Sequence, residues 1–244
     1  MSLTRQILCE GYHDRAFWYG LLEKLGCKFA KEHSLPGHRK SPGEYVGVTP
    51  DGGVVSIVPV DGVPNLLPAV ETRLLQREVR PIQHLIVNRD ADTQAGEEGG
   101  MQSTALLRLA ERLNIAARLT AEGDVILEEG AMRLSLVRWE ADGETQEGIP
   151  NQQTLERMVS LAIHRAYPER SAEVSAWLRS RTGPPTYDLK EIAWSYMAGW
   201  FADSGCEDFY RALWREKRIS AELEQILRDN GTWRVAESLA QSEG

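Results

Sequence analysis

Two short apolar segments, residues 6–9 and 85–87, constrain the fold of this chain more than any other feature. Segments this short and this apolar are typical of buried strands. Carboxylates follow both segments: Glu10 and Asp14 after the first, and Asp90 and Asp92 after the second. Gly11 supplies the backbone freedom that a tight turn from strand to helix requires. We therefore expect acidic side chains to follow two strands.

The segment after Gly11 predicts a helix, because apolar residues recur there at helical spacing. These residues are Phe17, Trp18, Leu21, Leu22 and Leu25. Asp14 then lies in or just before the first helical turn, where the helix dipole favours an anion.

The carboxyl ends of parallel strands are where ligands collect in open α/β sheets. Glu10 and the pair Asp90 and Asp92 fall there if the two strands are parallel. Packed carboxylates repel one another without a cation. The cluster therefore favours Mg²⁺, which proteins bind through one or two carboxylates together with water and phosphate oxygens.

The motifs Glu10-Gly11-x-x-Asp14 and Asp90-x-Asp92 resemble the two signature motifs of the toprim domain. This domain is shared by topoisomerases, bacterial primases, recombination-repair proteins and overcoming-lysogenization-defect nucleases. Between the motifs, residues 54–60 read as a strand and 61–65 lead into a helix, which is the family's order of elements. The resemblance spans roughly residues 5–115. It implies an α/β, Rossmann-like domain with a mainly parallel sheet, which we expect over residues 4–145.

The resemblance also implies roles for the acidic residues. Asp90 and Asp92 would hold Mg²⁺ or Mn²⁺, and Glu10 would act as a general acid or base or as a further metal ligand. Asp14 would orient the turn or reach the metal through water. The activity implied is metal-dependent phosphodiester chemistry on DNA or RNA, most simply by a nuclease. The alternative is a non-catalytic module that binds a metal, a nucleic acid or a partner protein.

One departure from the family pattern lies between Val87 and Asp90, where Asn88 and Arg89 intervene. Arg89 could contact a phosphate or compete with a metal for Asp90. Arg39 and Lys40 offer a further basic patch for nucleic acid. The net charge of −8 argues against a broad nucleic-acid surface, so we favour the interpretation that scattered basic residues are solvated.

The segment 150–240 predicts an all-helical domain, after a hairpin formed by 124–127 and 132–139. Glu156, on its first expected helix, is expected to face solvent. The domain carries five tryptophans: Trp177, Trp194, Trp200, Trp214 and Trp233. Base stacking would be their functional interpretation, but their spacing favours core packing.

Other classes of protein fit the sequence less well. No apolar run reaches the length of a membrane span and no secretory signal is evident, so we expect a cytoplasmic protein. The three cysteines, Cys9, Cys27 and Cys206, are expected to be small buried hydrophobes. No phosphate-binding loop of the ATPase type is present, so an ATPase or another protein partner would be a separate chain. The Asp90-Ala91-Asp92 triplet alone would also suit a Mn²⁺-dependent nucleotide-sugar transferase.

Overall fold

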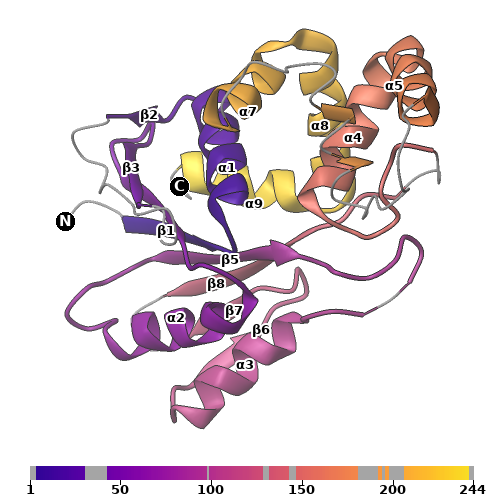
Figure 1. Ribbon diagram of the computed structural model, residues 1–244. Coiled ribbons are helices and arrows are strands. Elements are labelled where there is room, and N and C mark those ends of the chain that lie inside the picture. Colours follow the sequence, from indigo (N-terminus) through magenta and orange to yellow (C-terminus); the bar gives the residue numbers. More distant parts are fainter. Residues whose placement is uncertain are drawn as a thin grey trace. The chain divides into compact units, whose positions relative to one another are not determined.

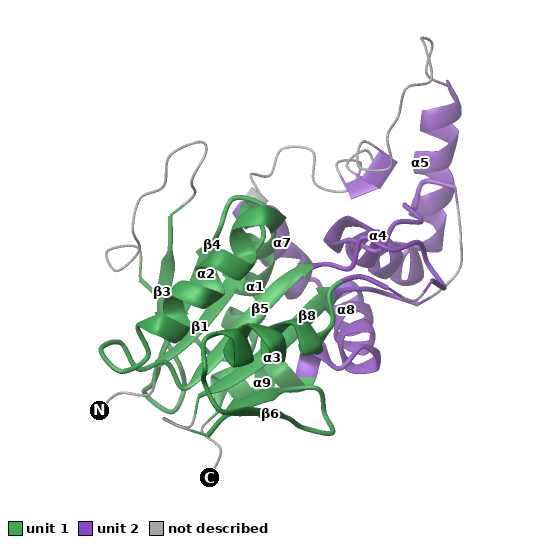
Figure 2. Ribbon diagram, turned by 90° about the horizontal axis from the view of Figure 1, so that it is seen from below, with its two compact units in different colours: residues 1–89, 101–138, 234–244 green, residues 90–100, 139–233 purple. Residues whose placement is uncertain are grey.

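The computed structural model describes residues 4–30, 43–97, 99–128, 132–142, 147–180, 192–193, 196–197 and 206–241. The chain divides into two compact units (Figure 2). Unit 1 comprises residues 1–89, 101–138 and 234–244, and unit 2 comprises residues 90–100 and 139–233. Each unit is made of segments that are separated in the sequence. The expected domain ranges, 4–145 and 150–240, remain predictions.

Three parallel strands form the centre of the sheet in unit 1: β4 (Val54–Pro59), β1 (Thr4–Cys9) and β5 (His84–Asp90). β1 pairs with β4 from Thr4 opposite Val54, and it pairs with β5 up to Cys9 opposite Asn88. The apolar segments predicted to be buried strands therefore lie side by side in parallel, as expected.

Shorter strands extend the sheet on both sides, in the order β2-β3-β4-β1-β5-β8-β7-β6 among the described residues. The pairs β2–β3, β3–β4, β6–β7 and β7–β8 are antiparallel. These strands are β2 (Lys28–Phe29), β3 (Tyr45–Val48), β6 (Ala117–Leu119), β7 (Val125–Leu127) and β8 (Arg133–Trp139). The hairpin expected from 124–127 and 132–139 is confirmed as β7–β8. The sheet is mixed, with the parallel pairs described confined to its centre.

Helices cover both faces of the sheet, with α2 and α3 on one face and α1 on the other (Figure 1). They are α1 (Tyr12–Lys24), α2 (Val63–Leu75) and α3 (Ser103–Arg112). α2 and α3 bury an apolar stripe against the strands, and the core there includes Leu8, Leu66, Val70, Leu74, Leu85, Val87, Leu106 and Leu134. The architecture is thus α/β, with helices on both faces of a mixed sheet.

Among the described residues, the regular elements that lie wholly in unit 2 are helices. They are α4 (Leu155–Ala166), α5 (Pro168–Ser180), α7 (Cys206–Arg215) and α8 (Lys217–Asp229). α4 packs against α5 and α8, and α7 packs against α8. α9 (Thr232–Ala240) begins in unit 2 and ends in unit 1. Most of residues 181–205 lie outside the described part, so an all-helical domain stays a prediction.

Burial in the C-terminal half corrects two expectations. Glu156 is buried, not solvent-facing, because α4 is enclosed on nearly every side. Trp214 and Trp233 are buried as expected, but Trp177 is 47% exposed. Trp194 and Trp200 lie outside the described residues. Among those residues, no helix is both long and apolar enough to cross a membrane.

The cysteines at 9 and 27 are buried, as expected of small hydrophobes. Burial raises the pKa of the Cys27 thiol to about 11, and it raises that of Cys9 well above its ordinary value. A thiol held protonated is a poor nucleophile. Both residues therefore serve packing.

A buried polar network in unit 1 joins β5, β8 and α9 to Asp124, the residue before β7. The Ser135 hydroxyl donates to Asp124 Oδ1 at 2.6 Å. The distance between His84 Nε2 and Ser135 Oγ is 2.8 Å. Because the only hydroxyl proton of Ser135 goes to Asp124, the imidazole donates through Nε2. Asp124 also accepts from Arg133 and Arg234. Burial and the Arg133 charge lower the pKa of His84 to about 3.

We expect the stability of the protein to fall with pH because of His84. Its pKa in the folded chain, about 3, lies below its ordinary value of 6.5. At a pH between these two pKa values, His84 is protonated in the unfolded chain and neutral in the folded chain. The unfolding free energy should therefore drop by up to about 1.4 kcal/mol for each pH unit as pH falls from roughly 6 to 4.5. Urea denaturation across this window measures the slope.

The matched variant His84→Gln keeps an N–H donor for Ser135 but does not titrate. Its unfolding free energy should depend less on pH than that of the wild type, and the difference between the two curves isolates His84. Parallel curves in the two proteins would show that His84 is not the group responsible.

Candidate functional site

The turn after β1 is organised by Asp14. Gly11, in extended conformation, caps the start of α1, and its N–H donates to Asp14 Oδ2 at 2.8 Å. The Asp14 side chain is buried in this position, with 7% of its surface exposed. Of the two roles expected for Asp14, orienting the turn is therefore the one that its contacts support.

Glu10 follows the last residue of β1 and is held by its backbone. The Glu10 carbonyl accepts from the Gly62 N–H at 2.9 Å, and the Cys9 carbonyl accepts from the Val60 N–H at 2.9 Å. These bonds tie the turn after β1 to the turn after β4. Asp61 lies in the second turn with a φ of 62°, in the left-handed region. Asp61 is a third carboxylate at this end of the sheet, and its position after the apolar segment 54–60 was the available signal.

The two residues that separate Val87 from Asp90 extend strand β5. Asn88 is fully buried, and its side-chain Oδ1 accepts from the Trp18 indole N–H at 2.9 Å. This bond fixes α1 to the sheet. Since Cys9 pairs with Asn88 in parallel register, Glu10 and Arg89 are the next residues on the two strands. Asn88, one of the two residues between Val87 and Asp90, thus has a packing role.

Asp90 and Asp92 belong to unit 2, where both carboxylates bond to the segment that begins α4. Asp90 Oδ1 accepts from the N–H of Leu155, the first residue of that helix, at 2.9 Å. Asp92 Oδ1 accepts from Gln152 Nε2 at 3.2 Å, and the Asp92 N–H donates to the Gln153 carbonyl at 3.1 Å. Asp92 has a φ of 59°, so its backbone adopts a strained conformation that these bonds compensate. Both aspartates therefore have a local structural role.

Arg157 is the buried residue that sequence reasoning missed in this region. Its guanidinium is fully buried and donates to the carbonyls of Ala141, at 3.2 Å, and Pro150, at 2.7 Å. Burial lowers the pKa of Arg157. Gln153 supports the same segment, because its Oε1 accepts from the Ala141 N–H at 2.8 Å. Its neighbours at helical spacing, Ser160, Leu161 and His164, are mixed in polarity, so the sequence offered no signal of this burial.

A metal site built from protein ligands alone is not found in the described part of the chain. No three His, Cys, Asp or Glu side chains gather there in a way that could hold an ion. Glu10 and Asp14 lie in unit 1, whereas Asp90 and Asp92 lie in unit 2. A shared metal between Glu10 and the aspartates stays a prediction. The basic residues Arg39 and Lys40, expected to contact nucleic acid, lie outside the described residues.

Comparisons with known proteins identify a fold but no family. No family model and no curated protein matches the chain. The crystal structure of the hypothetical protein PH0156 from Pyrococcus horikoshii OT3 superposes with a TM-score of 0.73 at 14% identity, covering 98% of this chain and 100% of that one. The two proteins share a fold. A futalosine hydrolase mutant of Helicobacter pylori strain 26695 covers 91% of this chain and 99% of its own at 12% identity. Its TM-score is 0.27, which supports no inference.

We expect Asp90 to stabilise the start of α4 in the absence of any metal. Asp90→Ala leaves the Leu155 N–H without its acceptor and should lower the unfolding free energy by about 1 kcal/mol. Asp90→Asn keeps an oxygen acceptor at the same place and should lose less. Urea denaturation in EDTA measures both. Equal stabilities for the wild type and Asp90→Ala would contradict the capping role.

Proposed function

We propose that this chain is a metal-dependent phosphodiesterase of the toprim type that acts on DNA or RNA, most simply as a nuclease. The observation that carries the proposal is the parallel, in-register pairing of β1 with β5. Glu10 follows one of these strands, and Arg89 and Asp90 are the last residues of the other. Acidic residues that follow neighbouring parallel strands are at the end of a sheet where α/β proteins bind ligands.

The donor groups suit a hard divalent cation in their chemistry, because Mg²⁺ and Mn²⁺ prefer carboxylate oxygens. Glu10, Asp90 and Asp92 would hold the ion. Each aspartate engages Oδ1 in a bond within unit 2. The remaining ligands would be water and phosphate oxygens, as is common for Mg²⁺. A bound ion would neutralise charge on the phosphoryl group.

The protein's own residues have separable tasks in this proposal. Glu10 moves a proton, either from the attacking water or to the leaving oxygen. Arg89 pairs with a non-bridging phosphate oxygen through charge-assisted hydrogen bonds. Asp14 orients the turn that carries Glu10 through its bond to the Gly11 N–H. Hydrolysis adds the water oxygen to phosphorus and breaks one phosphorus–oxygen bond, and the departing oxygen gains a proton.

The second candidate is a non-catalytic binding module, and one observation favours it. The carboxylates of Asp14, Asp90 and Asp92 all accept bonds from nearby donors that fix turns or helix starts. Such bonds give these residues a structural role that requires no metal. The two candidates differ in whether Glu10 and Asp90 act together on a phosphodiester.

Metal binding should appear first as a gain in stability. We expect Mg²⁺ and Mn²⁺ to raise the melting temperature of the wild type as their concentration rises, because a ligand of the folded state alone stabilises it. Asp90→Asn should remove this gain while keeping the fold. Glu111→Gln, which changes an exposed glutamate on α3, is the matched control and should respond as the wild type does. A melting temperature that does not change with the concentration of either ion would contradict the metal site.

Cleavage separates the enzyme from the module. We expect Mn²⁺-dependent or Mg²⁺-dependent nicking of plasmid DNA, or cleavage of single-stranded DNA or RNA, in low salt, where an acidic protein binds nucleic acid best. Glu10→Gln and Asp90→Asn should each lower the rate by at least about a hundredfold, and Glu111→Gln should not. Wild-type protein that cleaves none of these substrates, or Asp90→Asn that cleaves as fast as wild type, favours the module instead.

A further inference from the structure

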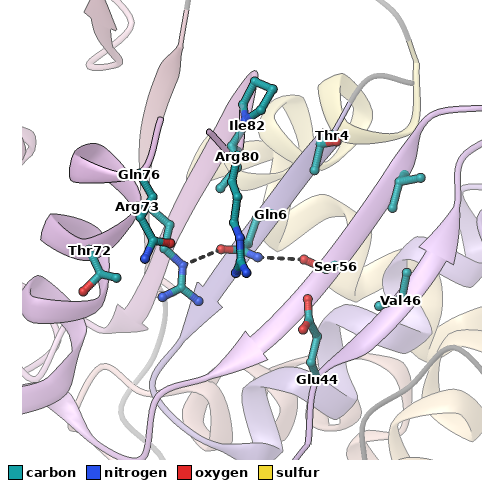
Figure 3. Close-up of a pocket in the computed structure, with 12 residues that line it drawn as sticks. Thr4, Gln6, Glu44, Val46, Ser56, Thr72, Arg73, Gln76, Arg80 and Ile82 are labelled. Carbon is teal, nitrogen blue, oxygen red and sulfur yellow. Dashed lines mark hydrogen bonds between the residues drawn. The ribbon is translucent and has the colours of Figure 1, made fainter. Parts of the chain in front are cut away.

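A cavity of about 660 Å³ lies in unit 1, on the face of the sheet that α2 borders. Its walls come from the amino-terminal parts of β1 and β4, from β3, and from the end of α2 with the segment leading to β5 (Figure 3). The volume is that of a small-molecule site, which is roughly 300–1,000 Å³. The cavity is remote from Glu10, because Gln6 precedes that residue by four positions on an extended strand, about 13 Å.

The cavity exists because this end of the sheet face is polar. Thr4 and Gln6 of β1 point to the same face as Leu8, since side chains alternate along a strand. Leu8 lies in the core under α2, whereas Thr4 and Gln6 line the cavity. Ser56 lies opposite Gln6 in the parallel register, and Gln6 Nε2 donates to Ser56 Oγ at 2.9 Å. The cavity floor is thus a pair of hydrogen-bonded polar side chains.

Arg73, on the last turns of α2, is fixed against this floor. Its Nε–H donates to Gln6 Oε1 at 2.8 Å, which directs the guanidinium along the cavity wall (Figure 3). The side chain is half-buried, and burial lowers the pKa of Arg73. Its remaining N–H groups make no hydrogen bond or ion pair with any other described residue. A half-buried guanidinium with N–H groups to spare favours an anion beside it.

Arg80 brings a second guanidinium to the same cavity from the segment after α2. Its side chain reaches toward the Gln6–Ser56 pair, while Glu44 points into the same space from the other side (Figure 3). Within the part of the chain that the structure describes, Arg80 forms no ion pair. The cavity therefore offers two cations at one end and a carboxylate across from them.

We propose that this cavity binds a small phosphate monoester that carries hydroxyl groups, such as a sugar phosphate or a nucleoside monophosphate. One arginine satisfies a carboxylate in bidentate fashion, whereas two arginines from different segments match the three terminal oxygens and higher charge of a phosphoryl group. The Gln6 and Ser56 side chains add polar contacts at the floor. Glu44 accepts from ligand hydroxyls, and its charge repels a second anionic group at that end.

Isothermal titration calorimetry of the full chain in EDTA tests the proposal without any contribution from a metal site. Ribose 5-phosphate and adenosine 5′-monophosphate should bind, and ribose and succinate should bind at least tenfold more weakly. Arg80→Gln changes an exposed side chain that makes no side-chain hydrogen bond with a described residue, and it should weaken both monoesters by about tenfold or more. Glu44→Gln should weaken the monoesters but should not weaken inorganic phosphate, because the change removes a negative charge from the cavity.

Arg108→Gln is the matched control, because Arg108 is an exposed arginine on α3 outside the cavity. It removes the same charge and should bind as the wild type does. Arg73→Gln should also weaken binding, and its urea denaturation curve reports whether it folds. Three results would each overturn the proposal. The first is no binding of either monoester at ligand concentrations up to about 10 mM. The others are wild-type affinity in Arg80→Gln, and equal losses of affinity in Arg80→Gln and Arg108→Gln. Because the assay contains no divalent ion, its outcome is independent of the nuclease proposal.

Discussion

The parallel pairing of β1 with β4 on one side and β5 on the other is the constraint on which the rest of unit 1 depends. β1 is buried on both faces at Ile7, Leu8 and Cys9, which leaves no exposed surface on these residues. A strand enclosed in this way cannot shift its register by one residue without turning its apolar side chains toward the wrong face. The register in turn sets which residues of the three strands lie side by side at the carboxyl end and which line the cavity at the amino end.

The acidic residues near that carboxyl end serve the fold as well as any chemistry. Asp14 holds the N–H of Gly11 at the start of α1, and Asp90 holds the N–H of Leu155 at the start of α4. The first N–H groups of a helix have no partner within the helix, so a carboxylate there is favourable on its own account. Motifs of this kind therefore have a structural role beside any catalytic one. The same holds for Asp92, whose bond to Gln152 supports a left-handed turn.

Local patterns in the sequence were sufficient for the central strands and for α1. The apolar segments 6–9 and 85–87 are strands, Asp14 is in the first turn of α1, and the β7–β8 hairpin is present. They were insufficient where burial depends on distant segments. Glu156 is buried and Trp177 is exposed, each against expectation. The sequence of a helix does not specify which distant segments pack against each of its faces. The short antiparallel strands β2 and β6 carry little periodicity, so their pairing could not be read in advance.

The sequence by itself determined the α/β class, the strand-to-turn position of Glu10 and the helix-start position of Asp14, because alternation and turn residues act over a few neighbouring positions. The tertiary structure decided which polar residues are brought together. It joined Arg234 to Asp124 in one buried network, and it set Arg73 beside Gln6 at the wall of a cavity. The two residues of each pair lie far apart along the chain. Only the pairing of the strands and the packing of the helices on the sheet bring them within hydrogen-bond distance.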